Sequence, residues 1–217
     1  KYVTLKEYVE RMKEDQKDIY YATGETIEAI KELPQLEKVL DKGYEVLYFT
    51  DNVDEFMANI IGNYSDKPFK SLLQGDLDLD TKEEKEEVEK KANDNKDLLA
   101  TLKEELKDKV SDVKLSTRLK TSPVCLVSDD GISINMAKTL NAMNQGNIQA
   151  NKILEINPDH ELFKALAKVY ETNKADNMSR GLPYDATNLL MISIRQLYGI
   201  TCLIGIAVLL IFLLWDI

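Results

Sequence analysis

The stretch 18–51 constrains the fold more than any other part of this 217-residue chain. A strand-like run over 18–21 leads to a turn at Gly24, and a second strand-like run covers 44–49 after a helix-ending Gly43. Between them lie apolar residues spaced three and four apart, namely Ile27, Ile30, Leu33, Leu36 and Leu40. A strand, a helix and a strand within about thirty residues predict a βαβ unit, with two parallel strands and a right-handed crossover.

Three segments of different character follow one another along the chain. Residues 1–75 are predicted to form one small α/β unit built around the βαβ stretch. Residues 76–97 are acidic and poor in apolar side chains, so we expect a solvated helix or a connector there. Residues 98–217 return to helical and strand-like patterns and predict a second, mixed unit. The expected fold class is therefore α/β or α+β.

Further elements are indicated by local patterns. In the first unit we expect helices over 2–12 and 53–63, the latter with one apolar stripe of Phe56, Met57, Ile60 and Ile61. In the second unit the predicted elements are a helix, two strands, a helix and a strand at 98–113, 113–119, 123–127, 133–144 and 152–156. Asn157-Pro158 then starts a helix, because Asn is preferred at the N-cap and Pro at the first helical position.

Composition excludes several classes of protein. The formal net charge of −10 argues against nucleic-acid binding, since phosphate contacts need clustered Lys and Arg. Cys125 and Cys202 lie far apart and form no metal or redox motif, as expected for reduced thiols in a cytoplasmic protein. Residues 1–17 are charged throughout, so we expect no signal region.

Residues for catalysis or metal binding are scarce. The sole histidine, His160, falls in a helical first turn, where a structural role is expected, and no glycine-rich phosphate loop is present. The carboxylates of Asp76, Asp78 and Asp80 have calcium-loop spacing, but Thr81 stands where such a loop needs glycine. We therefore predict no catalytic residue and no metal site.

Two apolar stretches have more than one interpretation. Ile132, Met136, Leu140 and Met143 form one helical stripe, which is either a core stripe or an adaptable surface for varied partners. The uncharged run 197–215 would span roughly 28 Å as a helix, close to the thickness of a bilayer core. It is a membrane anchor, a dimerisation segment or a sequence foreign to the rest of the chain.

Longer stretches of sequence carry a resemblance. YVERMKEDQKDIYYATGE at 8–25, LDKGYEVLYFTDNVDEF at 40–56, TSPVCLVSDDG at 121–131, MAKTLNAM at 136–143 and KILEINPDHELFKAL at 152–166 resemble the ninety-kilodalton heat-shock chaperone family in its bacterial HtpG form. The resemblance runs from Lys1 to about Lys174. It implies the end of that family's middle domain (1–75), an acidic connector (76–97) and its C-terminal dimerisation domain (98–217), with 175–217 an atypical apolar tail.

The resemblance also implies partners and roles. The family's ATP and magnesium sites lie in an N-terminal domain with no counterpart in this sequence, so we expect no cofactor and no enzymatic activity here. Unfolded client proteins are expected to contact Met136, Leu140 and Met143, which align with the family's client-contacting helix. The family's terminal helices pair across a dimer, and we expect a homodimer through Leu162, Phe163, Leu166, Val169, Tyr170, Leu189, Leu190, Ile194 and Leu197. Despite the apolar tail we expect no membrane partner; the alternative is a tail-anchored membrane adaptor with a cytosolic protein-binding domain.

Overall fold

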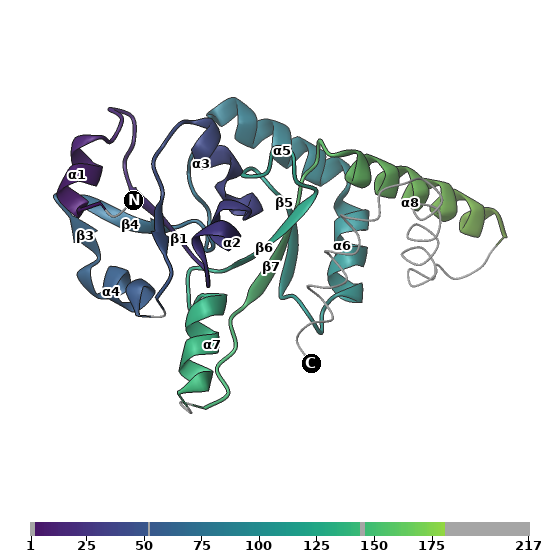
Figure 1. Ribbon diagram of the computed structural model, residues 1–217. Helices are drawn as coiled ribbons and strands as arrows, with labels where there is room; N and C mark the ends of the chain where they lie inside the picture. Colours follow the sequence, from purple (N-terminus) through teal and green to yellow (C-terminus); the bar gives the residue numbers. More distant parts are fainter. Residues whose placement is uncertain (1–2, 52, 144–145, 181–217) are drawn as a thin grey trace.

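The structure is a computed structural model that describes residues 3–51, 53–143 and 146–180. Two mixed β-sheets lie side by side, and helices cover them (Figure 1). The class is α+β, in agreement with the expectation of a mixed fold.

The first sheet is built around the predicted βαβ unit. Its strand order is β2-β1-β4-β3, with bounds Leu47–Phe49, Ile19–Thr23, Lys67–Ser71 and Asn63–Tyr64. β1 lies between two parallel neighbours, with Tyr21 opposite both Leu47 and Ser71, and β3 joins the edge antiparallel to β4. The prediction of two parallel strands is confirmed. Every residue of β1 is buried, as expected for a central parallel strand.

The crossover between β1 and β2 is not one helix, so that prediction was wrong. It consists of α2 (Ile27–Lys31), a 3₁₀ turn η1 (Pro34–Leu36) and α3 (Glu37–Asp41). Proline lacks an N–H and disfavours helical geometry in the residue before it, and Leu33 accordingly has extended dihedrals (φ −67°, ψ 122°). Of the predicted apolar stripe, Ile30 and Leu36 are buried, whereas Ile27 and Leu40 at its two ends are exposed. Gly43 ends α3 at φ +68°, as predicted.

Two short helices complete the first unit. α1 (Leu5–Glu10) starts with a capping box between Thr4 and Glu7, and α4 (Asp54–Ile61) ends at Gly62, which has a positive φ. Both helices were predicted, with ends a few residues further out.

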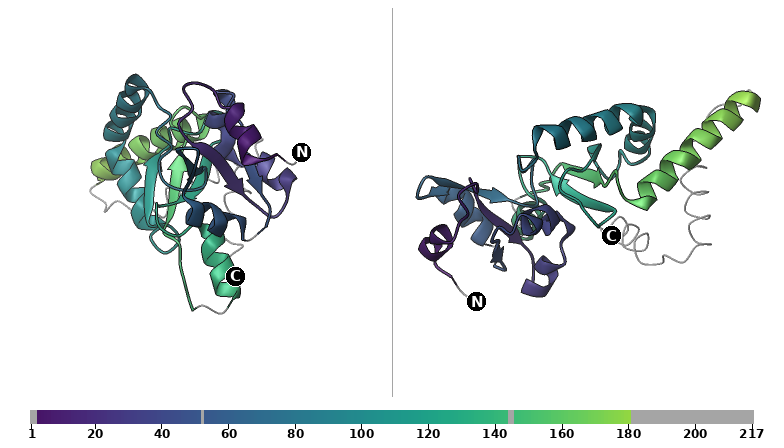
Figure 2. Two further views of the ribbon diagram at one scale, coloured as in Figure 1. Left: turned by 90° about the vertical axis from the view of Figure 1, so that its left-hand side faces the viewer. Right: turned by 90° about the horizontal axis from the view of Figure 1, so that it is seen from above.

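The second sheet has the order β5-β7-β6, with bounds Asp112–Leu115, Lys152–Ile156 and Val124–Ser128. β5 is parallel and β6 antiparallel to β7. α5 (Lys82–Asp94), α6 (Lys96–Glu105) and α8 (Glu161–Arg180) lie along one side, and α7 (Ile134–Ala142) projects on another (Figure 1). α8 extends away from the body of the molecule (Figure 2).

The acidic stretch 76–97 is anchored at its start. Leu77 is buried in the core of the first unit, and Thr81 caps α5 through a capping box with Glu84. α5 itself has no fully buried residue, but Val88 and Ala92 pack partly against the core of the second unit, so the helix is not solvated on every side as expected.

The core of the second unit includes residues predicted for the dimer interface. Phe163 and Tyr170 are buried among side chains of α6, β5 and β7, including Leu98, Leu102, Val113, Leu115, Leu154 and Ile156. Leu166 and Val169 pack partly against this cluster, and Leu162 is half-buried. The remaining predicted interface residues, Leu189, Leu190, Ile194 and Leu197, lie outside the described residues, as does the apolar run. Within the described part of the chain, no helix is long and apolar enough to cross a membrane.

Phe163→Ala should destabilise the chain, because it removes a buried aromatic ring from the core of the second unit. We expect a loss of about 3–5 kcal/mol in the free energy of unfolding, measured by urea titration. Leu162→Ala, on the neighbouring half-buried position of α8, is the control and should cost clearly less. Equal losses in the two variants would contradict the burial of Phe163.

Candidate functional site

α4 turns its apolar face to solvent. Ile60 is 85% exposed and Val53, just before the helix, 61%, and Met57 and Ile61 are also exposed. The buried residues of α4 are instead Ala58 and Glu55, which is only 3% exposed. The sequence stripe was correctly identified, but it does not belong to the core.

α7 carries the methionine stripe, and the structure places that stripe at the surface. Ser133 caps the helix by accepting a hydrogen bond from the Met136 N–H. Met136 and Leu140 are half-buried, and Met143, at the end of the helix, is 55% exposed. The stripe is therefore neither a fully buried core stripe nor a fully exposed one.

α4 and α7 meet although they come from different units. The Asn59 side chain of α4 donates to the Met136 sulfur at 3.3 Å. Glu55 is buried, which raises its pKa, and a hydrogen bond with Ser133 at the start of α7 opposes that shift. We define the α4–α7 surface as the exposed and half-buried apolar residues on, or next to, the two helices: Val53, Met57, Ile60, Ile61, Ile132, Met136, Leu140 and Met143.

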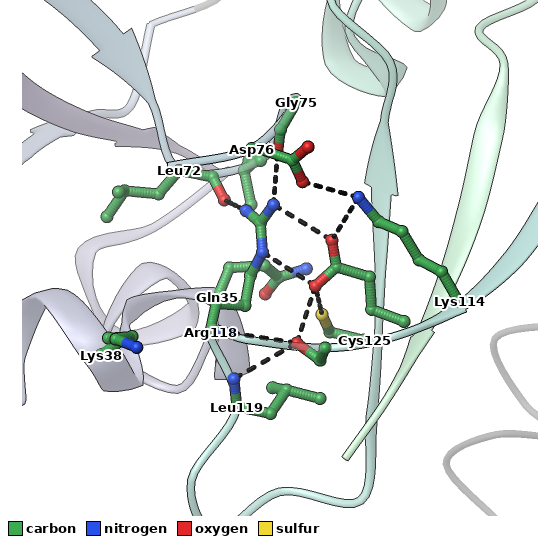
Figure 3. Close-up of polar contacts among 12 residues, drawn as sticks. Gln35, Lys38, Leu72, Gly75, Asp76, Lys114, Arg118, Leu119 and Cys125 are labelled. Carbon is green, nitrogen blue, oxygen red and sulfur yellow. Dashed lines mark hydrogen bonds and ion pairs between the residues drawn. The ribbon is translucent and has the colours of Figure 1, made fainter. Parts of the chain in front are cut away.

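A buried arginine joins the two units (Figure 3). Arg118, 3% exposed, follows β5 and donates from Nε and Nη2 to the Glu155 carboxylate at 2.9 and 3.1 Å. Its Nη1 also donates to the Leu72 carbonyl at 2.9 Å, and its Nη2 to the Gly75 carbonyl. The two carbonyls lie just after β4, where the chain leaves the first sheet. The Arg118 guanidinium therefore connects the segment after β4 to β7, the central strand of the second sheet.

Glu155 is held from several directions. This carboxylate on β7 is 2% exposed and accepts from the Ser116 hydroxyl at 2.7 Å, and the Lys114 ammonium lies 3.4 Å away. Lys114 also pairs with Asp76 at 2.7 Å. Each buried charge in this group thus has a partner of opposite sign.

The broken crossover supplies a second set of contacts, through Glu37 of α3. Its carboxylate accepts hydrogen bonds from the backbone N–H groups of Lys120, Thr121 and Ser122 at 2.5, 2.9 and 3.0 Å. It also accepts hydrogen bonds from the side-chain hydroxyls of Thr121 and Ser122. Burial acts to raise the pKa of Glu37, but these hydrogen bonds outweigh it and hold the pKa below its ordinary value.

Neighbouring residues of the same segment bind the acidic stretch 76–97 and the second unit. Lys38 is buried and forms ion pairs with Asp80, which precedes α5, and with Glu84 in the first turn of α5. Gln35 donates to the Leu126 carbonyl of β6 at 2.7 Å. The orientation of α7 relative to α4 therefore depends on the η1–α3 segment as well as on Arg118.

The other candidate residues from the sequence have structural contacts. α8 begins at Glu161 and not at Asn157-Pro158, so His160 precedes the helix rather than lying in its first turn, and its Nδ1 accepts the Leu162 N–H at 3.0 Å. Asp76, Asp78 and Asp80 pair with three different lysines, Lys114, Lys85 and Lys38. Cys125 is buried, and that burial raises the pKa of its thiol. Among the residues that the structure describes, no group of three or more His, Cys, Asp or Glu is arranged to hold a metal ion.

Sequence reasoning missed Arg118, Glu37 and Lys38. The signal for Arg118 was a cation inside a strand-like run, which calls for a buried partner. No comparable signal marked Glu37 or Lys38, since charged residues in a short helix are usually solvated.

Arg118→Met should destabilise the chain by about 3–5 kcal/mol, because it leaves the buried Glu155 carboxylate without its main partner. Urea titration gives the change. Lys107→Met, which removes an exposed pair with Glu104, is the control and should stay within the scatter of the measurement. If the pair is the reason, Arg118→Met combined with Glu155→Met should be more stable than Arg118→Met alone. A loss for Arg118→Met as small as the control's would contradict this account.

Comparison with known proteins identifies the family of this sequence. A sequence model of the family described as Hsp90 protein matches residues 1–190. Chaperone protein HtpG of Clostridium botulinum strain Langeland is 53% identical over 175 residues, which cover 80% of this chain and 28% of that protein. Chaperone protein HtpG of Bacillus subtilis strain 168 is 49% identical over 175 residues, with the same two coverages. That of Clostridium perfringens strain 13 is 51% identical over 176 residues, again 80% and 28%.

The chain thus spans about 28% of the length of the curated relatives it matches. Because the family match covers most of the chain and these relatives are about half identical to it, the chain belongs to the Hsp90 family of heat-shock chaperones and is similar to its bacterial HtpG members.

Proposed function

We propose that this chain holds unfolded or partly folded client proteins on its α4–α7 surface, as part of an ATP-dependent chaperone of the cytoplasm. The observation that carries the proposal is the exposure of apolar side chains on two adjoining helices, with Ile60 and Met143 the most exposed on α4 and at the end of α7. Extended apolar exposure on a folded protein marks an interaction site.

The composition of the surface suits varied partners. Met57, Met136 and Met143 are unbranched and polarizable, so they re-pack against different apolar groups at low cost. The surface also spans both units, so a client segment longer than one helix would contact both. The predicted client residues Met136, Leu140 and Met143 keep their assignment, and α4 adds Met57, Ile60 and Ile61.

The same proposal assigns a role to each part of the chain and places ATP hydrolysis outside it. Residues 1–75 act as the end of a middle domain and 98–217 as a C-terminal domain, with 76–97 between them. The chain contributes client contacts and self-association. ATP binding and hydrolysis belong to the rest of an HtpG-type protein, since this sequence has no glycine-rich phosphate loop.

Ile60→Ser combined with Met143→Ser should weaken client binding about tenfold or more, because each change removes apolar area that a client would cover. Binding is measured by fluorescence anisotropy with a labelled, permanently unfolded protein, and the melting temperature should scarcely move because both residues are exposed.

The matched control is Ile27→Ser combined with Leu40→Ser. These residues are also exposed, but they lie on α2 and α3. They should leave client affinity unchanged. The proposal fails if the two double variants weaken binding equally, or if neither does.

Self-association is the second part of the proposal. A two-fold interface buries the same patch on both copies, so one apolar stretch satisfies itself. Phe163 and Tyr170 are buried in the chain's own core, and Leu166 and Val169 pack partly against it. Leu162, with Leu189, Leu190, Ile194 and Leu197, are therefore the interface residues we propose.

Light scattering after size exclusion should give about twice the chain mass of 24.7 kDa. A chain ending at Arg180 should give the monomer mass, because it lacks most of the proposed interface. A monomeric full chain, or a dimer that survives the truncation, would show that residues 181–217 are not the interface.

A further inference from the structure

A cavity of about 440 Å³ lies beside α7, between this helix, the segment that returns to β7 and the turn after α6. Such a volume is within the usual range of ligand sites, ~300–1,000 Å³. Its lining includes Lys109, Leu126, Ile134, Ala137, Lys138 and Ile148.

The cavity lies on a different face of α7 from the client stripe. Ile134, Ala137, Lys138 and Asn141 line it and follow the spacing i, i+3, i+4, i+7 of one helix face. Met136, Leu140 and Met143 follow their own i, i+4, i+7 series, and Met136 contacts α4. The cavity is therefore separate from the α4–α7 surface.

Part of the cavity lining is apolar, and the segment opposite α7 is held in place. Val110 and Ala137 are buried, and Leu126, Ile134 and Ile148 are half-buried. The Asn141 amide donates to the Ile148 carbonyl and accepts the Ile148 N–H, both at 2.8 Å. This double hydrogen bond fixes the return segment against α7, so a ligand would not have to order it.

The rim is positively charged in an otherwise acidic protein. Lys109, Lys138 and Lys152 line the cavity, against one carboxylate, Asp108, whereas the whole chain carries −10. Across the described ranges of the chain, neither Lys109 nor Lys138 has an ion-pair partner. Two ammonium groups without an ion-pair partner, beside the apolar side chains of the lining, favour a ligand that combines an apolar group with negative charge.

We propose that this cavity binds an acidic peptide segment: one apolar side chain enters between Leu126, Ile134 and Ile148, and flanking Asp or Glu carboxylates pair with Lys109 and Lys138. The inference rests on the proposed function, because it takes the ligand to be part of a client protein. It adds a second, charge-selective contact on the opposite side of α7 from the apolar surface. Clients with apolar residues next to acidic ones would then be preferred over those with basic flanks.

The test uses the full chain and three fluorescein-labelled heptapeptides, Gly-Asp-Glu-Leu-Glu-Asp-Gly, its Asn/Gln analogue and its all-Lys analogue. Fluorescence anisotropy should give the highest affinity for the acidic peptide, decreasing as salt is added. Lys109→Gln combined with Lys138→Gln should weaken the acidic peptide about three- to tenfold and leave the neutral one unchanged, because two ion pairs near the surface are lost.

Two further variants make the result specific. Lys31→Gln combined with Lys164→Gln removes the same charge from two exposed positions away from the cavity and should leave all three affinities unchanged. Lys138→Glu should weaken the acidic peptide and strengthen the lysine peptide. An unchanged melting temperature confirms that each variant is folded.

The proposal is overturned if the Lys109/Lys138 variant loses no more affinity than the Lys31/Lys164 control, or if Lys138→Glu does not shift the preference. It is also overturned if only Ile60→Ser with Met143→Ser weakens the acidic peptide, since the peptide then binds the α4–α7 surface. Failure of the function itself is seen separately, as unchanged binding of the unfolded protein in that apolar variant.

Discussion

The buried ion pair between Arg118 and Glu155 is the interaction on which the arrangement of the two units depends. Burying a charge is costly unless it is paired and hydrogen-bonded, and both requirements are met here. The same guanidinium donates hydrogen bonds to the carbonyls of Leu72 and Gly75. The segment that follows β4 therefore cannot move without leaving these buried groups without hydrogen-bond partners. The pair thus contributes a defined orientation more than net stability.

That orientation also decides how α4 and α7 meet, because the two helices belong to different units. Each helix alone exposes only a few apolar side chains, which is ordinary for a protein surface. Held together at Asn59 and Met136, they form one broader apolar surface.

The break in the crossover helix serves the same junction. Pro34 stops α2 and restarts the chain as η1 and α3, and this second part carries Gln35, Glu37 and Lys38 toward the second unit. In a single continuous helix over 27–41, the direction of the residues after Pro34 would be fixed by the residues before it. The presence of Pro34 was enough to predict the break from the sequence. The partners of Glu37 and Lys38 could not be predicted from the local pattern, because they lie more than forty residues away in sequence.

The sequence by itself determined the parallel strands of the βαβ unit, the Gly43 helix end, the approximate positions of α4 and α7, and the family, because each depends on local spacing or on long matching stretches. Only the tertiary structure decided which face of each helix is covered. The stripe of α4 faces solvent, while Phe163 and Tyr170 of α8 pack inside their own unit. Periodicity states which residues share a face. What covers that face depends on contacts between residues distant in sequence, and those are set by the fold as a whole.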